Sequence, residues 1–497
     1  MSAFLELPTE ILYAIVLELV NGYNRKSLRC TCKGLSAVVE PILFSEIVLK
    51  TDSSALVRWS IPFCEALFEK DQRARALATY VRTLKVDSKV EYSSLFRKDD
   101  ANQKLEILDA WRVIFPTALS KLVSLQSFRR VFFTGCWKMS RTGWIDDQVF
   151  EVISKLPSLF EFILAGEHLE VGYPGALRLD YLHNLRTLLI DARQFPDDGF
   201  EENIFRPLAT AITNSPDLQT LQILTPYSRS KPLSFIDLFK SVLDTKRTPA
   251  LKIKNLTVEN LTMDVPALII PHLQCLSSLD LRAGHTDVGN FWNALGTANV
   301  SLESLIVVCH NTDRTLLDYI SHFPSTLQVL QLASTAATFR ESDELADLFF
   351  DSVLPIFAES LRELSIRPSH EGRWCIGLHG NLATLSSCTN LESLFVCLNG
   401  DKIVDVVGDV VSRAHSLPRL KSLYLGTTFS HSNGMDYHKR MWKTLRETVE
   451  NLQPTEAHIG TGLRILPFYS FTEIWRTWED GSLSYVVNRR IKVVKRR

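Results

Sequence analysis

Six stretches in the second half of the chain share one pattern: LSSLDL at 276–281, LESLIV at 302–307, LQVLQL at 327–332, LRELSI at 361–366, LESLFV at 391–396 and LKSLYL at 420–425. In each, an apolar residue is followed by two variable residues, a leucine, one variable residue and another apolar residue. Alternation of this kind is typical of a short strand with one buried face. The pattern predicts a series of strands whose variable positions face outward.

Less regular copies occur upstream: Val81-Leu84-Val86, Leu159-Phe162-Leu164, Leu185-Leu188-Ile190, Leu218-Leu221-Ile223 and Ile253-Leu256-Val258. Leu125 and Phe128 mark a weaker one. Helical patterns lie between the strands, for example the apolar face of Leu345, Leu348, Phe349, Val353 and Phe357. A strand plus a helix, repeated about eleven or twelve times, resembles the leucine-rich repeat. Such repeats stack into a solenoid with a curved parallel sheet and helices on its convex side. An ordinary α/β domain is the alternative.

The first fifty residues differ from the repeats. The segment LELPTEILYAIVLELV predicts a first helix capped by Thr9, with Ile11, Leu12 and Ile15 on one face. A second helix follows, and Pro41 is expected to end a third. Three short helices bury too little surface to be comfortably stable alone. Some of their apolar residues must therefore face another surface, either the solenoid or a partner.

This segment resembles an F-box. The resemblance is carried by Leu7-Pro8, Glu10-Ile11-Leu12, Ile15, Leu19, Leu28, Cys32-Lys33, Val39, Pro41, Leu43 and Phe44. The whole chain then resembles the fungal-type F-box/leucine-rich-repeat proteins. The fold expected is α/β, with a three-helix F-box at 1–50 and an irregular leucine-rich-repeat solenoid at 51–497. The last part of the solenoid, from about residue 440, is expected to form a C-terminal cap.

The resemblance implies a non-catalytic role. F-box proteins bind the Skp adaptor and, through it, a cullin–RING ubiquitin ligase. By that resemblance the chain is the substrate receptor of an SCF-type ligase, and its repeats bind a target protein. The expected adaptor contacts are Leu7, Pro8, Ile11, Leu12, Ile15, Leu28, Pro41 and Phe44. Two alternatives are that the segment only caps the solenoid, or that the chain is a binding scaffold that recruits no ligase.

The target surface is expected among the outward strand positions. These are mostly polar in the early copies and partly apolar in the later ones. The candidates are Arg282, Ile306, Val308, Arg367, Phe395 and Tyr424. Apolar and aromatic groups beside arginine are typical of binding hot spots. The alternative is that late helices or loops fold over this strip and bury it.

The composition of the chain argues against several classes of protein. The 497 residues carry 55 basic and 56 acidic side chains, a net charge of −1, which argues against a nucleic-acid or membrane-coating protein. Acidic residues interrupt the N-terminal apolar run, and nine cysteines show no disulfide framework. We therefore expect the cytoplasm, the nucleus or both. The basic end of the chain, VVNRRIKVVKRR, is either an import or acidic-partner patch or a solvated tail.

Motifs of catalysis are absent from the sequence. It contains no HExxH, no GxSxG and no GxxxxGK[ST]. Cys309 and His310 adjoin a predicted strand, but no further cysteine or histidine stands at ligand spacing. We expect no catalytic residue, no metal ligand and no cofactor.

Overall fold

The computed structural model describes residues 7–487 apart from 20–21, 52–54, 69–71, 89–100, 134–146, 168–176, 194, 196, 198, 227–231, 245–249, 265–266, 283–287, 309–311, 334–338, 377–380, 429–433, 453–462, 470–471 and 480–481. The chain divides into two compact units, Met1–Ile253 and Lys254–Arg497. Both units are α/β. No helix in the described part of the chain is long and apolar enough to cross a membrane.

The first unit begins with three helices, α2 (Thr9–Glu18), α3 (Gly22–Arg29) and α4 (Lys33–Leu43). Two details differ from the sequence prediction. Pro8, rather than Thr9, takes the capping position of α2, and no side chain caps that helix. Helix α4 runs through Pro41 to Leu43, so the proline does not end it, although it cannot donate a hydrogen bond to the carbonyl four residues earlier.

A parallel sheet follows in the first unit, in the order β1 (Glu46–Lys50), β2 (Thr83–Ser88), β3 (Ser127–Phe133), β4 (Glu161–Glu167), β5 (Thr187–Asp191) and β6 (Thr220–Leu224). The sheet thus begins at Glu46, inside the range predicted for the F-box. The other elements of this unit are η1 (Leu56–Ser60), α6 (Ile61–Ala66), α7 (Gln72–Tyr80), α8 (Ala101–Leu119), α9 (Asp147–Ser154), η5 (Leu179–Tyr181), η6 (Glu201–Phe205), α10 (Arg206–Thr213), β7 (Leu233–Ser234), η7 (Phe235–Leu238) and α11 (Lys240–Asp244).

The second unit has a parallel run of β8 (Asn255–Glu259), β10 (Ser278–Arg282), β11 (Ser304–Val308), β12 (Val329–Ala333), β13 (Glu363–Arg367), β14 (Ser393–Leu398), β15 (Ser422–Thr427) and β16 (Arg464–Tyr469). Two antiparallel strands, β17 (Thr472–Glu479) and β18 (Ser482–Val487), continue the sheet. The remaining elements are β9 (Leu261–Thr262), α12 (Ile270–Leu273), α13 (Gly289–Thr297), α14 (Arg314–Ser321), α15 (Phe339–Leu348), η8 (Phe349–Val353), η9 (Leu354–Phe357), α16 (Asn381–Leu385), η10 (Gly400–Lys402), α17 (Ile403–His415) and α18 (Gly434–Asn451).

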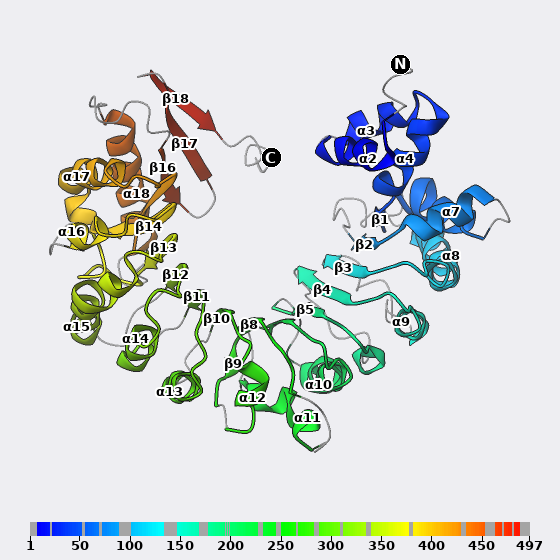
Figure 1. The fold of residues 1–497 in the computed structure, drawn as a ribbon, viewed down its shortest axis with the longest axis horizontal. Coiled ribbons are helices and arrows are strands. Elements are labelled where there is room, and N and C mark those ends of the chain that lie inside the picture. The colour runs from blue at the N-terminus through cyan, green and yellow to red at the C-terminus, as the bar shows by residue number, and fades with distance from the viewer. Residues whose placement is uncertain are drawn as a thin grey trace. The chain divides into compact units, whose positions relative to one another are not determined.

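The register explains why the repeat pattern recurs. The central leucines of neighbouring copies pair across the strands, from Leu279 through Leu305 and Leu330 to Leu364, and all are buried. Each therefore packs on equivalent residues of the adjacent strands and on the helices that cover that face (Figure 1). The predicted strands are confirmed, because the second and third apolar positions of each copy fall on a strand, while the first position lies just before it. The arrangement in each unit is compatible with a solenoid.

Candidate binding sites

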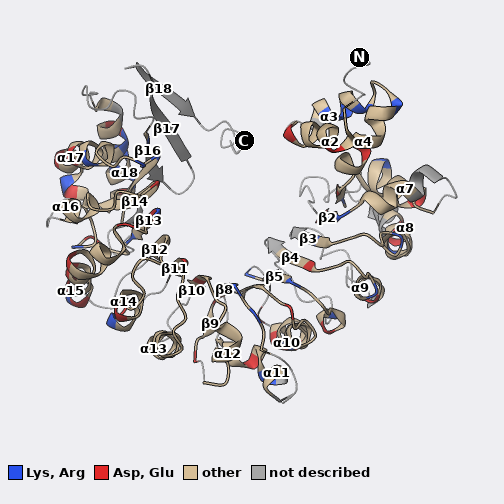
Figure 2. Cartoon of the chain, viewed as in Figure 1, with Lys and Arg blue, Asp and Glu red and all other residues tan. Residues whose placement is uncertain are grey.

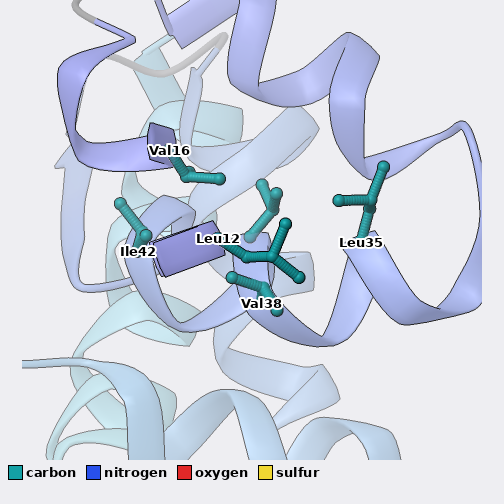
Figure 3. Packing of buried hydrophobic residues seen from close by; sticks show 6 residues of the cluster. Leu12, Val16, Leu35, Val38 and Ile42 are labelled. Carbon is teal, nitrogen blue, oxygen red and sulfur yellow. The ribbon is translucent and has the colours of Figure 1, made fainter. Parts of the chain in front are cut away.

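The three N-terminal helices enclose a small apolar core. Its buried members are Leu12, Val16, Leu35, Val38, Val39 and Ile42 (Figure 3). Leu28, Cys32 and Leu43 pack against them. Helix α2 contributes Leu12, which is 5% exposed, and Val16, which is fully buried. Leu12, predicted as an adaptor contact, therefore lies in the interior of the three helices.

Helix α2 keeps further apolar residues on its outside. Ile11 is 48% exposed and Ile15 is 37% exposed, and the two are one helical turn apart. Leu7 and Pro8 precede them and are also exposed. On the opposite flank of the buried stripe, Tyr13 and Leu17 are exposed as well. The exposed apolar residues of α2 therefore lie on two separate flanks, one formed by Ile11 and Ile15 and the other by Tyr13 and Leu17.

The other predicted adaptor contacts are half-buried. Leu28 packs against the three-helix core, and Pro41 lies in the last turn of α4. Phe44 follows that helix and lies under the Arg29 guanidinium, whose carbon is 5.2 Å from the ring centroid. Arg29 also donates to Glu40 at 2.9 Å, which ties α3 to α4. The structure thus brings the exposed Leu7, Pro8, Ile11 and Ile15 together and gives the remaining four a packing role at least in part.

A second candidate site lies on the outward face of β13, β14 and β15. Arg367, Phe395 and Tyr424, all predicted from the sequence, form a stacked series there. The Arg367 guanidinium carbon is 4.3 Å from the Phe395 ring centroid, and the Phe395 and Tyr424 rings are 6.2 Å apart and inclined by 20°. Arg367 Nε also donates to Ser365 Oγ at 3.1 Å. Partial desolvation lowers the pKa of the Arg367 guanidinium.

Gly426 makes room for the Phe395 ring. A Cβ atom at this position would lie 2.9 Å from Phe395 Cζ and 3.2 Å from Cε1. Both distances are shorter than ordinary van der Waals contact. Gly426 is on β15, one strand away from Phe395 on β14, so the ring lies across the neighbouring strand. The orientation of the ring therefore depends on the missing side chain.

Residues 368–376, which we call the strap, cover part of this face. The Ile376 N–H donates to the Cys397 carbonyl at 2.9 Å, and the Arg373 N–H donates to Asp343 at 2.8 Å. Trp374 packs against both Phe349 and Phe350. Cys375 of the strap forms a buried cluster with Phe395 and Cys397. Burial raises the pKa of the Cys397 thiol to about 12.

The strap is fixed at its other side by Glu371. Its carboxylate accepts from the Gly400 N–H at 2.9 Å and from the Tyr437 hydroxyl at 2.8 Å. Burial and this hydrogen bond raise the pKa of Tyr437 to about 12. Phe395 is consequently only 5% exposed, whereas Tyr424 is half-buried and Arg367 is exposed. Phe395 thus lies beneath the strap, as in the alternative in which a loop covers the strip.

An open depression remains beside the stacked series. It has a volume of about 290 Å³ and is lined mainly by Glu363, Ser365, Arg367, Ser393, Phe395 and Tyr424. The lining comes from outward positions of adjacent strands, since Ser365 pairs with Phe395 and Phe395 pairs with Tyr424. We call this feature the β13 depression. It offers a cation, an anion, hydroxyl groups and aromatic surface in one place.

The other predicted target contacts lie elsewhere on the sheet. Arg282 on β10 makes a two-point ion pair with Asp280, at 2.8 and 3.0 Å. Ile306 is half-buried and Val308 is exposed, both on β11. Ile306 pairs with Gln331 of β12, which lines the β13 depression, but neither Ile306 nor Val308 lines it.

Sequence reasoning missed apolar groups on the early strands. Val48, Ile163 and Leu189 hold the same outward register as Lys85 and Arg129. The predicted change from polar to apolar along the face is therefore only partial. Their own strands could have revealed them, because Ile163 and Leu189 each lie between two buried apolar positions and Val48 lies between the half-buried Ile47 and the buried Leu49. Figure 2 shows basic and acidic residues interspersed over the elements of each unit.

Within the described residues, no group of three or more His, Cys, Asp or Glu side chains is placed to hold a metal ion. The basic segment from Asn488 to the C-terminus lies outside the described residues, as do Cys309 and His310. A scan against protein-family models and a search of the curated proteins both return no match for this chain.

Proposed function

We propose that the chain is the substrate-recognition subunit of an SCF-type cullin–RING ubiquitin ligase. In this proposal residues 1–50 act as an F-box that binds the Skp adaptor. The repeats bind a target protein and hold it at high effective concentration near the ubiquitin-charged enzyme. The proposal implies no bond chemistry by the chain itself.

The observation that carries the proposal is that some apolar residues of α2 are buried and others are exposed. Leu12 and Val16 complete the internal core, whereas Ile11, Ile15 and Leu7 are left at the surface. Burying an aliphatic side chain of this size contributes about 1.5–3 kcal/mol. An apolar partner groove is therefore the favourable environment for these residues, as in other helix-in-groove interfaces. These exposed positions are among those that the resemblance to an F-box assigns to adaptor contacts.

The outward face of the sheet supports the second half of the proposal. The β13 depression combines an arginine, two aromatic rings and hydroxyl groups at its walls. Arginine and tyrosine are enriched among residues that dominate protein interfaces. The strap and Gly426 hold the Phe395 ring in place, which favours a preformed contact surface.

Co-purification tests the proposal. A tagged full-length chain is expected to recover the Skp adaptor and a cullin, and the variant Leu7→Ala with Pro8→Ala is expected to lose both. Circular dichroism of the variant serves as the control for folding. A wild-type chain that repeatedly recovers other proteins but no adaptor would replace the ligase proposal with that of a binding scaffold.

A further inference from the structure

The β13 depression carries opposite charges at its two ends. Glu363 begins β13 and Arg367 ends it, and both line the depression. Their Cα atoms are four steps apart along an extended strand, which is about 13 Å at about 3.3 Å per step. Side chains at alternate positions of a strand share a face, so Ser365 lies between them on the same side. The lining therefore presents a carboxylate, a small hydroxyl and a guanidinium in sequence.

Ser365 and Ser393 explain why space exists here. Their side chains are small, while Phe395 and Tyr424 occupy the next positions along the sheet. The rings form a wall beside the space that the serines leave. The middle of the depression is thus suited to an apolar side chain, which would contact the rings above the two hydroxyl groups.

Arg367 is held in a defined orientation. Its guanidinium stacks on Phe395, and its Nε donates to Ser365. Phe395 is itself fixed by the strap and by the close approach to Gly426. A guanidinium with restricted motion loses less entropy on binding, and its planar geometry suits a carboxylate.

The two charged side chains of the depression favour some charged ligands over others. A phosphoryl group carries about −1.5 to −2 charges at neutral pH and is favoured by clusters of arginine. Here the charged lining is one guanidinium and one carboxylate, so a dianion would gain one attraction and meet one repulsion. A ligand with opposite charges at its two ends would instead be attracted at both.

We propose that the β13 depression binds an extended segment of the target protein that carries an acidic and a basic side chain four residues apart, with an apolar side chain midway. In an extended peptide, side chains at i, i+2 and i+4 share one face and repeat at the spacing of β13 itself. The acidic group meets Arg367, the basic group meets Glu363, and the apolar group fills the space over Ser365. This inference rests on the proposed role of the repeats in target binding.

Selection from a phage-displayed library of random linear peptides on the purified full-length chain tests it. The enriched peptides are expected to share the acidic, apolar and basic pattern in one direction. A fluorescent synthetic peptide of the enriched sequence should bind Arg367→Ala about tenfold or more weakly than wild type, since a hydrogen-bonded charged contact is removed. Arg362→Ala is the matched control, because Arg362 is exposed just before β13 and does not line the depression.

Charge reversal separates recognition from damage to the fold. The double variant Glu363→Arg with Arg367→Glu should prefer a peptide whose two charged residues are exchanged, because a gain of preference for that peptide cannot come from damage to the fold. Enriched peptides without this pattern, or binding that Arg367→Ala leaves unchanged, would overturn the inference. Peptide selection does not involve the Skp adaptor. A chain that selects such peptides without binding the adaptor supports this inference and refutes the ligase proposal. A chain that binds the adaptor but selects no such peptides refutes this inference and leaves the ligase proposal standing.

Discussion

Gly426→Ala should destabilise the second unit through a single added methyl group. The new Cβ would lie 2.9 Å from Phe395 Cζ, about 0.5 Å closer than ordinary contact allows. Phe395 cannot simply turn away, because Arg367 stacks on its ring and Cys375 and Cys397 pack around it. Either the ring or the backbone of β15 must move.

The expected cost is about 1–3 kcal/mol, the range found when a methylene group is forced into a packed core. Gly408→Ala provides a matched control within the same unit. Gly408 lies inside α17, and a Cβ at this position would meet no heavy atom within 4 Å. That substitution should stabilise the chain by about 0.5–1 kcal/mol, because alanine favours the helix over glycine.

Urea denaturation followed by tryptophan fluorescence measures both effects, as shifts of the transition midpoint at constant slope. The double variant Gly426→Ala with Phe395→Leu removes the clashing ring atoms, so its cost should be less than the sum of the single costs. If Gly426→Ala proves as stable as wild type, or if the costs are simply additive, the packing described around Phe395 is wrong.

Three further predictions concern other parts of the chain. Leu12→Ala should lower the unfolding free energy by about 2–5 kcal/mol, whereas Ile11→Ala should change it by less than about 1 kcal/mol; urea titration compares them. Burial lowers the pKa of His272 below its usual 6.5, so the unfolded chain binds the proton more readily and stability should fall as the pH drops below 6.5. His272→Gln should reduce that fall in urea midpoints measured at pH 7.5 and 5.5, and an unchanged fall would exclude His272 as its source. Asp343→Ala removes the acceptor of the Arg373 N–H and should therefore speed alkylation of Cys397. Mass spectrometry measures this rate, with the exposed Cys275 as the internal reference. Equal Cys397 rates in the variant and in wild type would show that this contact does not hold the strap closed.

The repeating part of the fold could be predicted because its burial is periodic. Leu279 and Leu305 occupy equivalent places in successive copies, so each copy supports the same interpretation. The strap could not be found in this way, because residues 368–376 have no periodic pattern and their contacts reach Asp343 and Cys397 from separate elements. The burial of Phe395 depends on those contacts.

The sequence predicted which residues of the N-terminal helices belong to the candidate site, but not which of them are buried in the core. The sequence places Ile11, Leu12 and Ile15 on one helix face, yet only Leu12 points into the three-helix core. The choice depends on how α4 crosses α2, which no local pattern encodes. Tyr13 and Leu17 were also left out, although their exposure matches that of Ile11. Because Tyr13 and Leu17 lie on the opposite flank of α2, substitutions there can be compared with substitutions at Ile11 and Ile15.

Calorimetric titration of the purified full-length chain with the purified Skp adaptor measures the contact on which the proposed function depends. Ile11→Asp with Ile15→Asp places two charges on the proposed contact flank, whereas Tyr13→Asp with Leu17→Asp places two charges on the opposite flank of the same helix. We expect wild type to bind, the first variant to lose at least about a hundredfold in affinity, and the second to stay within about tenfold of wild type. A wild-type chain that does not bind the adaptor, or equal losses for the two variants, would contradict this expectation.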